Sequence, residues 1–139
     1  MTSMKDRRGA SAVELALILP FLVLFMLGAT DYGRFARVDI SVEAAAGAGA
    51  RKGADTPVTD ETLDRWESAV RQVVVEEMRG LSDYVDEQLK VTATRTTQSD
   101  GNSTVKVIVK YPFSTMLKWP GIPKETTLTA TATAKGLHP

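Results

Sequence analysis

The chain has 139 residues, which leaves room for one modest domain with a small hydrophobic core. Its 17 Lys and Arg balance 17 Asp and Glu, so it lacks the basic excess typical of nucleic-acid-binding proteins. Cysteine is absent and His138 is the one histidine, which disfavours a serine or cysteine nucleophile paired with an imidazole. We therefore expect no enzymatic activity, no cofactor or metal, no small-molecule substrate and no nucleic-acid partner.

An apolar stretch near the N-terminus is long enough to cross a membrane. No charged side chain occurs from Leu15 to Thr30. Extension back to Ala10 gives about 21 residues, which as a helix span a bilayer core of about 30 Å.

Basic residues flank this stretch unequally. Three precede it and two follow it closely: Lys5, Arg7 and Arg8, then Arg34 and Arg37. Because basic residues are enriched on the cytoplasmic side, this pattern places the N-terminus in the cytoplasm. The C-terminal part would then face the periplasm or the cell exterior.

Glu14 is the charged exception inside the apolar segment. An ionised carboxylate near hydrocarbon costs about 2.5 kcal/mol or more unless it has a partner. A cut between Gly9 and Ala10 would create a positively charged amine on Ala10, on the same helix end or on a neighbouring subunit. Our hypothesis is that Glu14 pairs with that amine.

The first residues also resemble a known processing pattern. A basic leader ends in Gly9, the small residue Ala10 follows, and Glu14 takes the fifth position of the processed chain, ahead of the long apolar run. This order resembles the class III signal of type IV pilins and pseudopilins, which a prepilin peptidase cuts on the cytoplasmic side.

The closer resemblance is to the TadE-like family of minor pilins of the tight-adherence (Flp-type) pilus. Three features carry it: Pro20 inside the apolar run, the sequence DYGR at residues 31–34, and the sequence AAAGAGAR at residues 44–51. The resemblance implies a minor pilin or pseudopilin in the bacterial inner membrane. Its implied partners are the membrane, the prepilin peptidase, other pilins or pseudopilins, and the pilus assembly machinery. A role in the shaft, at the tip or at the base stays open.

Several residues of this segment have expected positions. Pro20 removes one backbone hydrogen bond inside the helix, which predicts a kink near residues 16–20. Asp31, Tyr32 and Arg34 are expected at the outer membrane interface, where amphipathic rings are common.

Two other classes of protein fit the N-terminal residues. An ordinary secretory signal would release a soluble envelope domain whose first residue lies near Thr30 or Asp31. An uncut single-pass module would keep Met1 and have no role in pili.

The predicted organisation has four parts. Residues 1–9 are the leader, 10–34 the transmembrane helix, 35–54 its amphipathic extension, and 55–139 an extracytoplasmic α+β head domain. Apolar positions at three- and four-residue spacing past Arg34 predict one helix from Ala10 to about Ala50.

A face of small residues ends this long helix. Ala45, Gly49 and Gly53 lie at four-residue intervals, which lets another backbone approach closely. Packing against the chain's own sheet and contact with another subunit both fit this face, and we favour the first.

A second helix is predicted from Thr59 as N-cap to a stop at Gly80. Its apolar stripe is expected to pack in the core, with Trp66 as a core residue rather than a ligand platform. The stripe comprises Leu63, Trp66, Val70, Val73, Val74 and Met78.

Three strands are predicted at residues 91–97, 104–111 and 126–133, with Pro112 ending the second. Their alternating pattern predicts a three-stranded antiparallel sheet with one face on the helices, and thus an α+β fold. Together with the long N-terminal helix, this order of elements resembles the build of pilin-like subunits. Trp119 falls in an irregular stretch between the last two strands, where partner contact and burial over the sheet edge are both open.

Overall fold

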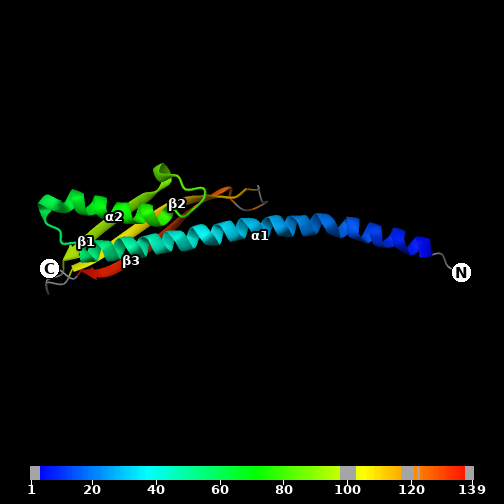
Figure 1. The fold of residues 1–139 in the computed structure, drawn as a ribbon, viewed down its shortest axis with the longest axis horizontal. Helices are drawn as coiled ribbons and strands as arrows, with labels where there is room; N and C mark the ends of the chain where they lie inside the picture. Colours follow the sequence, from blue (N-terminus) through cyan, green and yellow to red (C-terminus); the bar gives the residue numbers. More distant parts are fainter. Residues whose placement is uncertain (1–3, 98–102, 117–120, 122, 137–139) are drawn as a thin grey trace. The chain divides into compact units, whose positions relative to one another are not determined.

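The computed structural model of the chain describes residues 4–97, 103–116, 121 and 123–136 (Figure 1). The chain divides into two compact units, Met1–Arg34 and Phe35–Pro139. The unit Phe35–Pro139 contains the end of the long N-terminal helix, another helix and a three-stranded antiparallel sheet, so the predicted α+β fold is confirmed. In chain order the elements are α1 (Met4–Asp55), the short 3-10 helix η1 (Asp60–Thr62), α2 (Leu63–Met78), the short 3-10 helix η2 (Asp86–Gln88), β1 (Lys90–Thr97), β2 (Ser103–Ser114) and β3 (Glu125–Gly136).

The helix α1 runs without a break through both units. It contains Pro20 in its interior and ends at Asp55. The prediction of one continuous helix from Ala10 to about Ala50 is confirmed, with an end a few residues later. Residues 4–9 of the predicted leader are helical as well. The kink at Pro20 stays a prediction.

The second helix begins differently from its sequence pattern. Thr59 caps η1, where its backbone N–H donates to Thr62 Oγ1 at 2.9 Å, and α2 itself begins at Leu63. Such 3-10 turns are frequent at helix N-termini. Leu63 therefore lies at the very start of α2 and is 43% exposed, so its assignment to the buried stripe was wrong. Val73 is half-buried, and the rest of the predicted stripe is buried: Trp66, Val70, Val74 and Met78.

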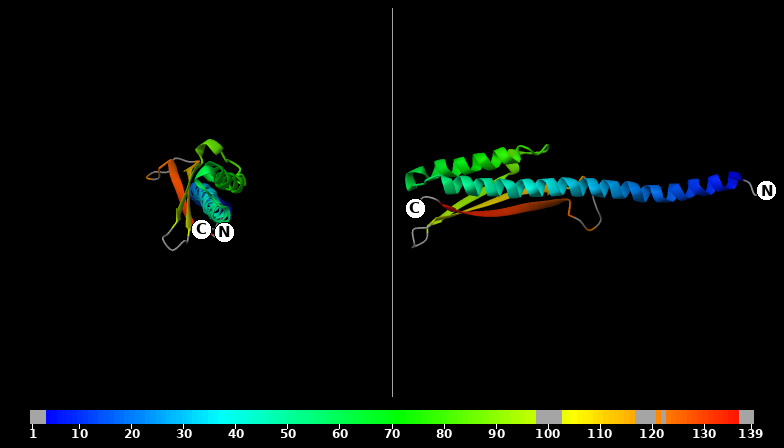
Figure 2. Two further views of the ribbon diagram at one scale, coloured as in Figure 1. Left: turned by 90° about the vertical axis from the view of Figure 1, so that its left-hand side faces the viewer. Right: turned by 60° about the horizontal axis from the view of Figure 1, so that its bottom comes forward.

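The sheet has the order β1-β2-β3, and both pairings are antiparallel. On β2, Val105, Val107 and Val109 are buried while Lys106 and Lys110 are exposed. This alternation confirms the predicted orientation of the second strand, and the two further views show the sheet beside the helices (Figure 2).

Pro112 does not end β2, contrary to the sequence prediction. The pairing of β1 with β2 ends at the Lys90–Lys110 pair, whereas β2 continues against β3 as far as Ser114. Past Lys110 the strand has a neighbour on one side only, and proline is tolerated at such an edge position. Phe113 beyond it is 6% exposed and meets Phe35 edge-on at 5.5 Å between ring centroids. Burial of this ring accounts for the longer strand.

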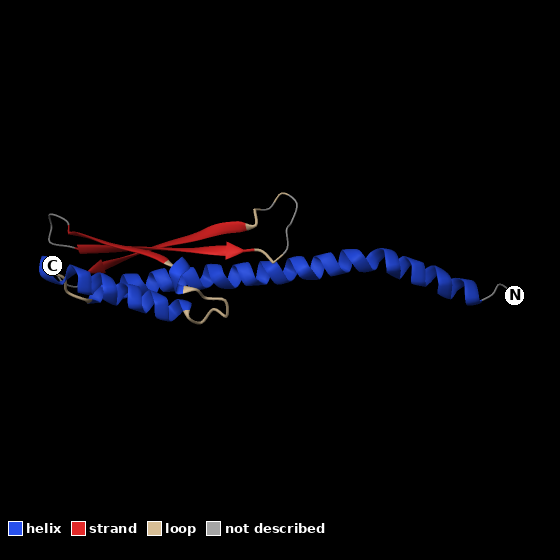
Figure 3. Cartoon of the chain, turned by 90° about the horizontal axis from the view of Figure 1, so that it is seen from above, coloured by secondary structure: helices blue, strands red, loops and turns tan. Residues whose placement is uncertain are grey.

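Within Phe35–Pro139 the helices form one layer and the sheet the other (Figure 3). The small-residue face of α1 lies in the core between them. A Cβ added at Gly49 would lie 2.7 Å from Val74 Cγ2 of α2 and 3.3 Å from Val107 Cγ1 of β2. The favoured interpretation, packing against the chain's own sheet, is thereby confirmed.

Trp66 joins α2 to the end of α1. Its side chain is 2% exposed, and its Nε1–H donates to the carbonyl oxygen of Gly53 at 3.0 Å. A buried indole N–H needs such a partner. The prediction that Trp66 is a core residue is confirmed.

Candidate functional site

The large apolar residues of α1 from Val13 to Leu27 are exposed around the whole helix. Twelve large apolar side chains from Val13 to Leu27 are exposed, up to 76% for Phe25. A helix that is apolar all round is stable when a protein core or a membrane surrounds it. Within the part of the chain that the structure describes, α1 is the helix long and apolar enough to cross a membrane. This segment is the candidate functional site.

Glu14 lies exposed within this apolar surface, four residues after Ala10. Residues four apart in a helix lie on the same face, about 5–6 Å apart between their Cβ atoms. In the intact chain the Ala10 nitrogen is a peptide amide and carries no charge. Cleavage after Gly9 would turn it into a cation one helical turn from the Glu14 carboxylate.

An ion pair lies at the end of the apolar stretch. Arg34 Nη1 is 3.3 Å from Asp31 Oδ1, and the Asp31 side chain is 8% exposed. A buried carboxylate requires a charged or hydrogen-bonded partner, which Arg34 supplies from the next turn. Tyr32 between them is 72% exposed. The location of these residues at the membrane interface stays a prediction.

A comparison with protein families covers this same segment. The model of a family described as TadE-like protein matches residues 9–51. Residues 9–51 are TadE-like. The resemblance drawn from the sequence is therefore confirmed over this range, hereafter the TadE-like segment. No curated protein and no solved structure matches the chain.

The TadE-like segment lies within α1. Its first half carries Gly9, Ala10, Glu14 and Pro20 with the exposed apolar side chains. Its second half carries Ala45 and Gly49, which lie in the core. The segment thus combines a membrane-compatible helix with the helix that forms part of the core of Phe35–Pro139.

The sequence analysis missed a polar cluster after α2. The Tyr84 hydroxyl donates to Asp86 Oδ1 at 2.7 Å, and Arg71 Nη2 of α2 lies 3.4 Å from Asp86 Oδ2. The Tyr84 ring stacks on Tyr111 of β2 with centroids 6.0 Å apart. No local pattern indicates the contacts that involve Arg71 and Tyr111, because both residues are far from Tyr84 and Asp86 in the sequence. The cluster fixes the loop between α2 and β1.

Burial, together with the hydrogen bond to Asp86, raises the pKa of Tyr84 from 10.0 to about 12. The folded chain therefore holds the phenol proton more tightly than the unfolded chain. This contribution to stability is complete below pH 10 and is lost as the pH rises through 12. The thermal unfolding midpoint, followed by circular dichroism, is expected to fall between pH 10 and 12.

Two variants separate this effect from other alkaline titrations. The unfolding midpoint of Tyr84→Phe should fall less steeply in this pH window than that of the wild type. The midpoint of Tyr32→Phe, a change at an exposed position, should follow the wild type. Identical slopes for the wild type and Tyr84→Phe would contradict the assignment.

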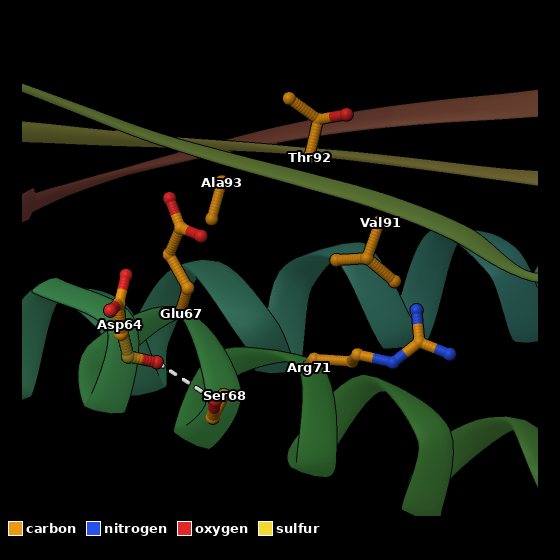
Figure 4. Close-up of a pocket in the computed structure, with 7 residues that line it drawn as sticks. All are labelled: Asp64, Glu67, Ser68, Arg71, Val91, Thr92 and Ala93. Atoms are coloured by element: carbon orange, nitrogen blue, oxygen red, sulfur yellow. Dashed lines mark hydrogen bonds between the residues drawn. The ribbon is translucent and has the colours of Figure 1, made fainter.

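A shallow hollow of about 390 Å³ lies between α2 and the edge strand β1 (Figure 4). In the close-up, Val91 and Ala93 point toward α2, while Thr92 points away. Carboxylates of both Asp64 and Glu67 line the hollow together with Arg71, which pairs with Asp86. Its lining is therefore of mixed charge.

Trp119, the aromatic candidate for partner contact, and His138 lie outside the described residues.

Proposed function

We propose that the chain is a minor pilin or pseudopilin that takes part in assembly of the tight-adherence pilus. A prepilin peptidase cuts it between Gly9 and Ala10. The helix then holds it in the inner membrane with its N-terminus in the cytoplasm and residues 55–139 outside. The protein acts as an assembly component and not as an enzyme.

One observation carries this proposal: an exposed, all-round apolar helix with a lone carboxylate lies inside a TadE-like segment. The apolar side chains favour lipid, and they favour equally the apolar helices of neighbouring subunits. Glu14 favours a position with a cation beside it. Movement from lipid into a bundle of such helices satisfies both requirements.

Glu14 sets the axial register of the helix in this proposal. A displacement along the helix axis would leave the carboxylate in an apolar environment without a counterion. That penalty is several times the thermal energy, because an unpaired charge in the membrane costs about 2.5 kcal/mol or more. The register in which Glu14 meets the Ala10 amine, on the same or a neighbouring subunit, is therefore selected.

Replacement of Gly9 by leucine is expected to leave an uncut precursor. The branched side chain next to the scissile bond would prevent the close approach of a protease to the backbone. Immunoblots of membranes should show the variant as a slower band, nine residues longer than the mature chain.

Gly33→Leu is the matched control for this experiment. A Cβ at Gly9 or at Gly33 meets nothing within 4 Å, so neither substitution disturbs packing. The Gly33 variant should be cut as the wild type is. Normal cutting of Gly9→Leu would contradict processing at this bond.

A further inference from the structure

The face of the sheet opposite the helices, hereafter the outer face, carries mainly threonine and lysine. Strand alternation and the register assign its members, and most of them are exposed. They are Lys90, Thr92, Thr94 and Thr96 on β1, Thr104, Lys106, Ile108, Lys110, Pro112 and Ser114 on β2, and Glu125, Thr127, Thr129, Thr131, Thr133 and Lys135 on β3.

The charges of the outer face are nearly all positive. It has four lysines, and the acidic residue among its members is Glu125, at the very start of β3. Lys90 and Lys110 are direct cross-strand partners. Like charges directly opposite each other destabilise a sheet, and no ion pair of either lysine occurs among the described residues.

Protection of a sheet edge does not explain these lysines. Lysine on an edge strand discourages unwanted strand pairing, but Lys106 and Lys110 belong to the central strand β2. A repulsive pair on an open face is relieved when an acidic surface covers it. The outer face therefore has the chemistry of a docking surface for an acidic partner.

The same chain supplies such an acidic surface. Residues 60–87, hereafter the acidic segment, contain nine Asp and Glu against three Arg. The segment comprises η1, α2 and most of the following loop, and it belongs to the layer on the other side of the sheet (Figure 3). Glu76, Glu77 and Glu87 are among its exposed carboxylates.

We propose that the outer face of one copy of the chain docks on the acidic segment of a second copy. The two surfaces differ, so the contact is heterologous, and a docked pair still offers one free outer face and one free acidic segment, on different copies. Repetition of the contact gives a head-to-tail row of sheets and helices. Threonine hydroxyls between the lysines can donate hydrogen bonds to the partner and accept hydrogen bonds from it.

This contact does not depend on cleavage after Gly9 or on Glu14, since both surfaces belong to Phe35–Pro139. It is tested with the full chain in detergent micelles, by mixing ¹⁴N- and ¹⁵N-labelled protein and adding a zero-length carbodiimide. This reagent joins a lysine amine to a carboxylate in contact with it. We expect mixed-isotope peptides that join Lys90, Lys106 or Lys110 to the acidic segment, and fewer of them at high salt.

Charge reversal provides the decisive comparison. Lys106→Glu with Lys110→Glu should reduce the cross-linked dimer about tenfold, because like charges then face each other. Adding Glu76→Lys and Glu87→Lys to the same chain should restore it. Arg51→Glu with Lys52→Glu, at exposed positions on α1, removes two cations elsewhere and should leave the dimer unchanged.

Three results would overturn the proposal. These are the absence of mixed-isotope cross-links, cross-links to carboxylates outside the acidic segment, and failure of the fourfold variant to regain the dimer while its circular dichroism matches the wild type. Lysine-dependent binding to phosphatidylglycerol vesicles without cross-linked dimers would assign the outer face to a lipid surface instead.

Discussion

Glu14→Ala is expected to abolish incorporation of the chain into pili without loss of folding or membrane insertion. Removal of the carboxylate makes insertion easier by about 2.5–3.5 kcal/mol, so the amount of membrane-bound protein should not fall. The axial register of the helix among its neighbours is lost, because no charge remains to pair with the Ala10 amine. Quantification of the chain in sheared pili and in membranes, by immunoblot, measures both effects.

Glu43→Ala is the control, since Glu43 is an exposed carboxylate on the same helix but outside the apolar stretch. It should give normal incorporation. Normal amounts of the Glu14 variant in pili would remove the proposed role of this carboxylate.

Gly53→Leu is expected to unfold the compact unit Phe35–Pro139 or to lower its free energy of unfolding by about 3 kcal/mol or more. Even a single Cβ at this position would lie 2.9 Å from Val105 Cγ1 and 3.0 Å from Trp66 Cζ2. A leucine would separate α1 from both α2 and β2 and would break the Trp66 hydrogen bond to the Gly53 carbonyl. Chemical unfolding of the full chain in detergent, followed by circular dichroism, measures the loss.

Gly47→Leu serves as the matched control on the same helix. A Cβ at Gly47 meets only Arg51 Nη1, at 3.5 Å. Because leucine favours a helix more than glycine does, the control should be unchanged or more stable by up to about 1 kcal/mol. Equal stability of the two variants would contradict the internal packing of the small-residue face.

The elements predicted best are those whose signal is periodic and local. The alternation of Val105, Val107 and Val109 with lysines gave the correct inner face of the sheet, because side chains in a strand alternate strictly. The three- and four-residue spacing after Arg34 gave the continuous helix, because residues three and four apart lie on the same face of a helix.

The features that the sequence could not supply depend on residues far apart in the chain. Pro112 remains in a strand because β1 has already ended beside it and Phe113 is buried against Phe35. The cluster of Tyr84 with Tyr111 requires that the loop after α2 meets β2. Small residues such as Gly49 predict a close approach but not the partner, and the fold supplied Val74 and Val107.

The residues of the candidate site could all be named from the sequence, because an apolar run, one carboxylate and a short basic leader are consecutive features. The processing site, the role of Glu14 and the membrane-interface residues remain predictions that need chemistry beyond the fold. The structure adds that Glu14 is exposed and that Asp31 is paired with Arg34.

The first residue of the native protein tests the proposed function most directly. Intact mass and N-terminal sequencing of the chain, purified from bacterial membranes and from pili, determine it. Cleavage by a prepilin peptidase predicts Ala10 as the first residue, with a free amine available to Glu14. A protein that begins at Met1, or near Thr30 or Asp31, would contradict it.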